Sequence, residues 1–300
     1  AGSTGVSAAV GSGSGKFRYN SKQGSSNYSA ALGTGLSAVY REQPTLTISV
    51  DAASSIVYGT STPSFSTTVS AQNGDTAAQA LSTAATVTAG GTTSSAGYLS
   101  AGTHTLTAAG AVDQLGYALA YSTNTLSVTQ ASLAVSGLTA SNKTYDTTTS
   151  ATLGGTAAIT ALTGDTVTLG GTAVGTFADK NAGTSKTVTV TGNTISGTDA
   201  ANYNLVQQTG LTANITQATL AVTGLTATNK TYDTTTTATL GGTASVTALA
   251  GDTVTVGGTA SGSFAGKSAG SAKAVTVSGN TITGTDAANY NLVQQTGLTA

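Results

Sequence analysis

The chain has 300 residues, a formal net charge of −1 and only 7% charged residues. An ordinary soluble domain carries about 25% charged residues. Nucleic-acid binding depends on a basic patch or stripe, so no nucleic-acid partner is expected. No apolar run reaches the roughly 18 residues of a membrane-spanning helix, so no membrane span is expected. The absence of Cys excludes disulfide bonds.

The first segment, residues 1–44, differs in composition from the rest of the chain. It is rich in Gly and Ser and contains four of the ten cationic residues, Lys16, Arg18, Lys22 and Arg41. We interpret it as a junction that follows an upstream domain, with any secretion signal lying upstream of Ala1.

The second segment, residues 45–130, has the pattern of a separate β domain. Leu46, Ile48 and Val50 alternate with polar residues and predict an opening strand. Residues 126–130 predict a closing strand in the same way. The segment resembles a shorter version of the repeat that follows it, with Tyr58 placed near the start.

The rest of the chain is a sequence repeat with a period of 87 residues. Tyr145-Asp146 recurs as Tyr232-Asp233, and residues 131–213 align with residues 218–300 at 66 identities in 83 positions. We therefore expect two β repeats, 131–217 and 218–300, with the last strand missing from the second. This period is too long for one solenoid coil but suits a small β domain.

Strand patterns dominate the repeats. Val188 and Val190 alternate with Thr and share one face of a strand. We interpret Gly170-Gly171 and Gly192-Asn193 as turns between short strands. The connection around Ile215 has no Gly/Pro/Ser linker, which predicts a stiff joint between the repeats.

These patterns predict an all-β protein that is a rod of tandem small β domains. Each domain is expected to be β-sandwich or β-grasp-like. A β-solenoid, including one that continues through residues 1–44, is the alternative.

Residues for catalysis or cofactor binding are scarce. His104 is the only His, and we interpret it as an exposed strand residue. The Gly-rich stretch Leu153–Thr156 precedes a strand rather than a helix, so a turn is favoured over a phosphate site. No Cys/His cluster or calcium loop is present, although oxygen-ligand calcium sites at domain joints stay open. We expect no enzyme activity, no catalytic, cofactor-binding or metal residues and no cofactor.

Some polar residues allow more than one interpretation. Lys143, Asp146 and Asn202 are the residue types of an internal isopeptide cross-link, but a turn at Asp146 and a core position for Tyr145 are favoured. Asp179 and Asn181 become Gly266 and Ser268 in the second copy, so a loop role is favoured over a ligand role. The pattern for N-linked sugar occurs at four positions, Asn27, Asn142, Asn214 and Asn229.

The repeat resembles the YDG domain of large bacterial adhesins. The residues that carry the resemblance are Lys143–Asp146, Gly164-Asp165-Thr-Val, Gly175–Lys180, Lys186–Val190 and Asp199–Leu205. Thr147 and Thr234 stand where the family usually has Gly after Tyr-Asp. Residues 45–130 resemble an MBG domain, a module often found beside YDG repeats. Residues 15–44 are similar to the segment that follows the β-helix in filamentous-haemagglutinin-like adhesins.

The resemblance implies a two-partner-secretion exoprotein at the bacterial cell surface, exported through a dedicated outer-membrane transporter. The expected role is a structural stalk or spacer that supports adhesion or a biofilm matrix, with neighbouring domains of the same chain as partners. The alternatives are a carbohydrate-binding array, for example one that binds extracellular polysaccharide, and a self-associating array.

Overall fold

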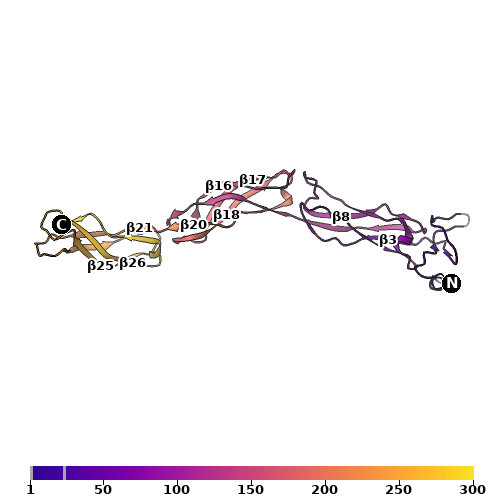
Figure 1. Ribbon diagram of the computed structural model, residues 1–300, viewed down its shortest axis with the longest axis horizontal. Coiled ribbons are helices and arrows are strands. Elements are labelled where there is room, and N and C mark those ends of the chain that lie inside the picture. The colour runs from indigo at the N-terminus through magenta and orange to yellow at the C-terminus, as the bar shows by residue number, and fades with distance from the viewer. Residues whose placement is uncertain (1–2, 23–24) are drawn as a thin grey trace. The chain divides into compact units, whose positions relative to one another are not determined.

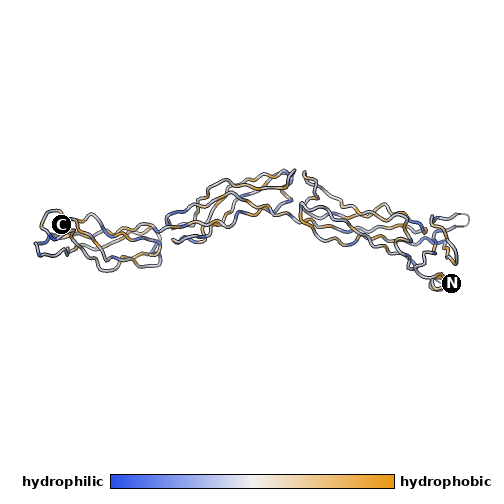
Figure 2. The backbone as a smooth tube through the Cα atoms, in the orientation of Figure 1, coloured by the Kyte–Doolittle hydropathy of each residue, from blue (hydrophilic) through white to orange (hydrophobic). Residues whose placement is uncertain are grey.

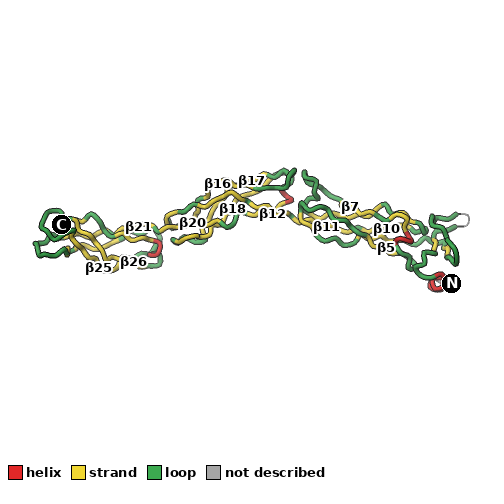
Figure 3. The backbone as a smooth tube through the Cα atoms, in the orientation of Figure 1, coloured by secondary structure: helices red, strands yellow, loops and turns green. Residues whose placement is uncertain are grey.

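The computed structural model describes residues 3–22 and 25–300, and its regular structure is dominated by β-strands (Figures 1 and 3). The chain divides into two compact units. The first unit contains residues 1–133 together with residues 160–168 and 195–205, two segments of the first repeat. The second unit contains residues 134–159, 169–194 and 206–300.

The N-terminal segment of the first unit is small. It contains the helix α1 (Ser3–Val10) and two short parallel strands, β1 (Phe17–Arg18) and β2 (Ala38–Val39). Phe17, Arg18 and Tyr19 are buried. The Arg18 guanidinium donates hydrogen bonds to four backbone carbonyls, which satisfy the donors of this buried charged group; the carbonyls are those of Gly15, Phe17, Ala30 and Ala31.

Residues 45–130 form three sheets. Their strand orders are β10-β3-β5, β4-β11-β8-β7 and β6-β9, and the pairs β10–β3 and β4–β11 are parallel. The strands are β3 (Thr45–Val50), β4 (Ile56–Val57), β5 (Thr67–Ser70), β6 (Leu81–Thr83), β7 (Thr86–Ala89), β8 (Gly102–Ala109), β9 (Val112–Asp113), β10 (Ala118–Ser122) and β11 (Asn124–Thr129), and one short helix is α2 (Ala77–Ala80).

The first repeat pairs β12 with β19, pairs β13 with β16, and forms a five-stranded sheet in the order β14-β20-β18-β17-β15. The elements are β12 (Ala131–Ala134), β13 (Ser136–Ala140), β14 (Lys143–Thr144), β15 (Ser150–Ala151), β16 (Leu153–Ala158), β17 (Thr168–Phe177), β18 (Gly183–Ser196), the 3-10 helix η1 (Ala200–Asn202), β19 (Tyr203–Val206) and β20 (Leu211–Thr216).

The second repeat follows the same plan in the second unit. It pairs β21 with β27, pairs β22 with β24, and forms a sheet in the order β23-β25-β26-β28. The elements are β21 (Ala218–Ala221), β22 (Thr223–Ala227), β23 (Thr237–Ala238), β24 (Leu240–Ser245), β25 (Thr255–Phe264), β26 (Ala274–Thr283), η2 (Ala287–Asn289), β27 (Tyr290–Val293) and β28 (Leu298–Thr299).

The prediction of an all-β chain of tandem small domains is confirmed, and the described residues form no closed solenoid. Burial follows the expected alternation. Val188 and Val190 of β18 are buried between exposed Thr residues, and Figure 2 shows hydrophobic and hydrophilic residues interleaved along the chain. One residue, Gln217, separates β20 from β21, as the missing linker predicted.

The prediction that glycine pairs end strands is wrong. Gly170-Gly171 lies inside β17 and Gly192-Asn193 lies inside β18. Gly171 and Gly192 have positive φ, and an added Cβ on Gly171 would lie 2.2 Å from the Gly192 carbonyl oxygen. Glycine is therefore required where two strand backbones approach closely, and at the counterpart Gly258 the register of β25 and β26 shifts as at a bulge. Gly154-Gly155 likewise lies within β16, not in a turn.

The interpretation of His104 as an exposed residue is also wrong. Its side chain is buried, and its two ring nitrogens lie 2.8 Å from the Gly90 carbonyl oxygen and 2.7 Å from the Ser100 carbonyl oxygen. Alternation puts His104 on the same buried face of β8 as Leu106 and Ala108, but the sequence did not show which groups would contact its ring nitrogens. A polar residue can occupy a buried position when backbone groups lie within hydrogen-bond distance of its side chain. The His104 ring therefore contacts the first and last residues of the loop formed by residues 90–100 and holds this loop in place.

Candidate functional site

A short strand followed by a tyrosine occurs three times, each time in the same local geometry. The strands β1, β4 and β14 each pair in parallel with a later strand, β2, β11 and β20 respectively. The residue that follows each short strand is Tyr19, Tyr58 or Tyr145, and each of these side chains is buried. The strand pairing fixes the backbone and therefore the direction of each ring.

A Gly-Asp turn lies opposite each of these tyrosines. Asp75, Asp165 and Asp252 each donate a backbone hydrogen bond to the carbonyl three residues earlier. The amide of that earlier residue donates to the hydroxyl of a second buried tyrosine, with distances of 3.1, 2.9 and 2.9 Å. The three donor–acceptor pairs are Gln72–Tyr117, Leu162–Tyr203 and Leu249–Tyr290.

Each aspartate accepts hydrogen bonds from both tyrosines, and we name each junction after its aspartate. The Asp75 junction contains Tyr19 and Tyr117, the Asp165 junction contains Tyr58 and Tyr203, and the Asp252 junction contains Tyr145 and Tyr290. The first two junctions lie in the first unit and the third lies in the second unit.

The Asp165 junction connects residues 45–130 with the first repeat. Oδ2 of Asp165 accepts from the Tyr58 hydroxyl at 2.5 Å and from the Tyr203 hydroxyl at 2.6 Å. Oδ1 accepts from the backbone amide of Ala96 at 3.2 Å. The two rings pack edge to face with centroids 5.3 Å apart. Both oxygens of the carboxylate are therefore satisfied.

Two further side chains of the first repeat accept from the same loop. Oδ1 of Asp199 accepts from the Ser95 amide at 3.0 Å, and Oδ1 of Asn202 accepts from the Ala101 amide at 2.8 Å. The linker residue Gln130 donates to the Ala201 carbonyl at 3.0 Å. These contacts hold the loop that His104 fastens.

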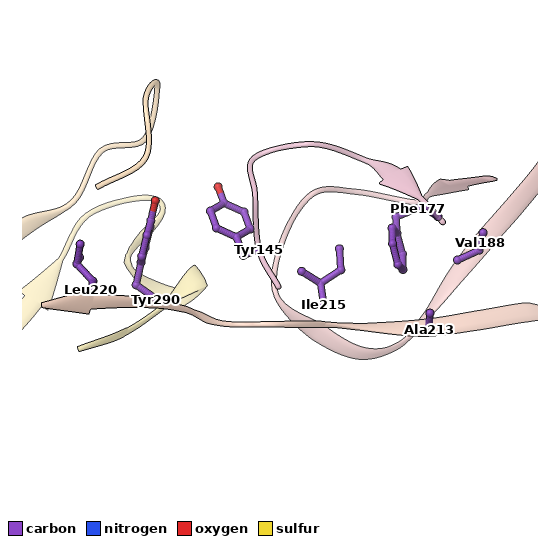
Figure 4. Close-up of a cluster of buried hydrophobic side chains, with 8 residues drawn as sticks. Tyr145, Phe177, Val188, Ala213, Ile215, Leu220 and Tyr290 are labelled. Carbon is purple, nitrogen blue, oxygen red and sulfur yellow. The ribbon is translucent and has the colours of Figure 1, made fainter. Parts of the chain in front are cut away.

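The Asp252 junction connects the two repeats. Oδ2 of Asp252 accepts from Tyr290 at 2.7 Å and from Tyr145 at 2.8 Å. Figure 4 shows the two tyrosine rings next to each other, with Ile215 on the far side of Tyr145 from Tyr290. Both rings belong to one hydrophobic cluster that contains residues of both repeats, Tyr145, Ala151, Phe177, Val188, Ala213, Ile215, Leu220 and Tyr290.

Lys180 of the first repeat takes part in the Asp252 junction. Nζ of Lys180 lies 3.0 Å from Oδ1 of Asp252 and 3.4 Å from Oδ1 of Asp286. The Asp252 side chain is 1% exposed, so the ammonium faces a desolvated carboxylate. The amide of Ala182 donates to Oδ1 of Asn289 at 2.9 Å. The linker residue Gln217 donates to the Ala288 carbonyl, also at 2.9 Å.

The Asp75 junction is less complete. Oδ2 of Asp75 accepts from Tyr117 at 2.9 Å and from Tyr19 at 3.3 Å. Oδ1 is buried and has no hydrogen-bond partner among the residues that the structure describes. A buried acceptor without a donor is costly, so this junction is the least stabilised of the three.

The pKa shifts follow these surroundings. Burial raises the pKa of Asp75, and hydrogen bonds from Tyr117 and Tyr19 offset this only in part. Burial also acts to raise the pKa of Asp252, but hydrogen bonds from Tyr290, Tyr145 and Lys180 together outweigh it and lower the pKa. Burial and the neighbouring carboxylate raise the pKa of Tyr290 to about 12. At neutral pH the tyrosines therefore stay protonated as donors.

The arrangement is suited to holding two segments together. Each tyrosine pair and each aspartate come from segments far apart in the sequence, and a buried carboxylate that accepts from two hydroxyls is a directional contact. Loss of one partner would leave buried polar groups unsatisfied, so the geometry strongly favours the bound arrangement.

Most of the other residues that the sequence singled out form local contacts within one repeat. Tyr145 is a core residue, and Asp146 forms the predicted turn by accepting from the Thr148 amide at 2.9 Å. Lys143 forms an ion pair with Asp146 at 2.6 Å. Asp179 pairs with Lys186 at 2.6 Å and accepts from the Asn181 amide. In the second copy, where Gly266 and Ser268 replace these residues, Lys273 donates to their backbone carbonyls instead.

The remaining candidates gather no further site. Asn27, Asn142 and Asn229 are exposed and Asn214 is half-buried, with its amide donating to Asn142 at 2.7 Å. Across residues 3–22 and 25–300, no three His, Cys, Asp or Glu side chains lie close enough together to hold a metal ion. The same residues contain no helix with the length and apolar character needed to span a bilayer.

The junctions were missed by the sequence reasoning, although a signal was present. The dipeptide Gly-Asp occurs at 74–75, 164–165 and 251–252, and each occurrence precedes a tyrosine by roughly 40 residues. The tyrosine that completes each junction lies about 110 residues before the aspartate for Asp165 and Asp252, in the preceding domain. An alignment of residues 45–130 with the two repeats links Tyr58 with Tyr145, but it does not reach Tyr19, which lies before residue 45.

The fold and these junctions define a tandem array of small β domains that are joined through buried Tyr–Asp contacts. A family comparison agrees, since the YDG domain matches residues 129–210 and 216–297, which together are more than half of the chain. The chain therefore belongs to the YDG domain family. No curated protein and no solved structure matches it.

Proposed function

We propose that this chain is a structural spacer segment of a large secreted bacterial surface adhesin of the filamentous-haemagglutinin-like type. In this proposal residues 45–130 are an MBG domain, the protein reaches the cell surface through an outer-membrane transporter, and the segment has no catalytic role. The observation that carries the proposal is the recurrence of one buried junction between successive domains.

A spacer has to transmit position from one domain to the next. Here the connection between the repeats is one residue, Gln217, whose side chain is bonded to the Ala288 carbonyl. Gln130 makes the equivalent bond to Ala201. A connector that is one residue long and hydrogen-bonded has little freedom, unlike a Gly/Ser linker. The domains therefore cannot rotate independently without breaking a junction.

The recurrence of the junction in residues 45–130 supports their relation to the repeats. Asp75, the amide of Gln72 and Tyr117 reproduce the turn and the second tyrosine of a YDG repeat. The family match begins at residue 129, so this relation depends on the geometry alone. We infer that both kinds of domain use one connection rule.

Small-angle X-ray scattering of the 300-residue chain tests the proposal. A compact body of this length has a radius of gyration of about 19 Å. Domains joined end to end should give a value nearer 35 Å, since strands rise about 3.3 Å per residue. Replacing both Asp165 and Asp252 by Ala should leave each domain folded but broaden the distribution of distances.

A compact particle would contradict the spacer role. Binding of matrix polysaccharide by the wild-type chain would favour a carbohydrate-binding array instead. A mass that rises with concentration in sedimentation would favour self-association. An ester, peptide or glycoside turned over by the chain, and lost on a point mutation, would contradict the absence of a catalytic role.

A further inference from the structure

Tyr232 is the fourth tyrosine of the junction series. It follows Lys230-Thr231 as Tyr145 follows Lys143-Thr144, with an offset of 87 residues. Tyr145 is 3% exposed and bonded to Asp252, whereas Tyr232 is 57% exposed. The structure gives Tyr232 no aspartate partner among the described residues.

The other donors of the junction recur beside Tyr232. Lys267 and Ala269 are the counterparts of Lys180 and Ala182, which bind the carboxylates and the amide oxygen of the second repeat. Lys267 and Ala269 are exposed, and Lys267 makes no ion pair within the described residues. Within the residues that the structure describes, the second repeat therefore presents the donor half of a junction, and no acceptor half faces it.

A groove of about 380 Å³ continues this surface. Its lining includes Asn229, Lys230, Tyr232, Phe264, Lys273 and Ala300. In the first repeat the equivalent space holds the end of β20, where Ile215 is 2% exposed and clusters with Phe177 and Tyr145. Ile215 also pairs with Lys143 of β14. The groove therefore has the lining that accepts an extended strand with a branched apolar residue.

We propose that Tyr232, Lys267, Ala269 and this groove form a docking face for the tip of a further YDG domain. The partner would enter through a strand equivalent to Asn214–Gln217 and would place a Gly-Asp turn against Tyr232. Charge is complementary, because the face supplies a lysine and a YDG tip supplies two carboxylates, as Asp252 and Asp286 do for Lys180.

A second copy of this chain is not the proposed occupant. Its two YDG tips, at Asp165 and Asp252, already contact Tyr58 and Tyr145 of the preceding domains. The inference deepens the proposed spacer function, since it assigns the rule by which the array is extended.

Chemical acetylation of tyrosine hydroxyls, read by mass spectrometry, tests the docking face. One sample is the 300-residue chain, and the other is the same chain followed by a second copy of residues 214–300 in which the counterpart of Tyr232 is replaced by Phe, so that the Tyr232 peptide occurs once in each chain. We expect Tyr232 to react at least ten-fold more slowly in the extended chain. Tyr121, which is 40% exposed, should react equally in both and is the matched control.

A variant separates docking from simple covering by the added strand. Replacing the counterpart of Asp252 by Ala in the added copy keeps the strand but removes the acceptor, and it should restore most of the reactivity of Tyr232. Equal reactivity in both chains, while the amides of the added copy are protected from exchange, would overturn the proposal. Protection of Tyr232 in the 300-residue chain that rises with concentration would assign the face to a second copy and would also overturn it.

The two proposals can fail separately. Scattering from the 300-residue chain does not depend on Tyr232. An extended particle with an undocked Tyr232 would reject the docking face alone, whereas a compact particle would reject the spacer role.

Discussion

The Asp165 and Asp252 junctions both connect successive domains through a buried aspartate, but they differ in the donor to Oδ1 of that aspartate. In both, Oδ2 of the aspartate accepts from two buried tyrosines. Oδ1 of Asp165 accepts from the backbone amide of Ala96, whereas Oδ1 of Asp252 accepts from the Lys180 ammonium. The tyrosines and the turn are therefore the constant part of the junction.

The same replacement occurs at the neighbouring carboxylate. Asp199 accepts from the Ser95 amide, and its counterpart Asp286 lies 3.4 Å from Lys180. One ammonium thus takes the place of two amides. Backbone amides can donate to the carboxylates only if their loop is held in place, here by His104. A lysine side chain is long and flexible, so its ammonium can reach both carboxylates from a loop that is held less tightly. The comparison indicates that the aspartate and the two tyrosines are constant between the junctions, whereas the donor to Oδ1 of the aspartate can be an amide or a lysine.

The largest effect is expected on removal of the aspartates. Asp252→Ala and Asp165→Ala should each cost about 3 kcal/mol at their own junction, because two buried hydroxyls lose their acceptor. Exchange of the Leu249 and Leu162 amides, which donate to Tyr290 and Tyr203, reports the two junctions separately.

The exposed Asp233, which pairs with Lys230, is the control for these variants. Its replacement by Ala should change neither amide, since exposed ion pairs contribute little. A loss at only one of the two junctions would show that their tyrosine pairs are not equivalent.

His104→Ala should loosen only the Asp165 junction. It removes a buried side chain whose two ring nitrogens contact the carbonyl oxygens of Gly90 and Ser100, for an expected loss of about 2 kcal/mol. Exchange of the Ser95 and Ala96 amides should accelerate, while the Leu249 amide stays unchanged. Unchanged exchange at Ser95 would mean that the loop is held by its contacts to the first repeat rather than by His104.

Acid should affect the Asp75 and Asp252 junctions in opposite directions. The folded pKa of Asp252 is below the unfolded value of 3.8, so its contribution is complete above pH 3.8 and is lost as the pH falls through the folded pKa. The folded pKa of Asp75 is above 3.8, so its contribution is greatest below pH 3.8 and is lost as the pH rises through the folded pKa.

Amide substitutions at neutral pH test the same difference. Asp75→Asn should be neutral or stabilising, because an amide resembles the protonated acid that burial favours there. Asp252→Asn should cost about 1 to 2 kcal/mol, since it replaces a charged acceptor of three donors. Amide exchange between pH 3 and pH 7 measures both trends. Parallel acid responses at the two junctions would contradict the role assigned to the donors of Asp252.

The smallest effect is expected from Lys180→Met, which keeps much of the side-chain length but removes the charge. The Lys180 side chain is 37% exposed, so solvent and salt screen its ion pairs. The Leu249 amide should exchange slightly faster at low salt and as in the wild type at high salt, with no change at Leu162. A salt-independent effect would indicate that Lys180 contributes by packing on Tyr145 instead.

The sequence determined the strands, the repeat and much of the core. Alternation placed Val188 and Val190 on a buried face, and the lack of a linker agrees with the single residue between β20 and β21. These features depend on neighbours within a few residues or on direct comparison of the two copies, so a linear reading is sufficient. The domain limits at 44, 130 and 217 stay a prediction.

Only the tertiary structure decided the junctions, the glycine bulges and the state of His104. Tyr58 and Asp165 are 107 residues apart, and nothing local marks them as partners. Gly171 looks like a turn residue until its strand partner is known, because the close approach of the Gly192 carbonyl requires it. Burial of His104 depends on two carbonyls that the loop 90–100 brings to its ring. Polar contacts between segments that are distant in sequence arise from packing, and local patterns carry no record of them.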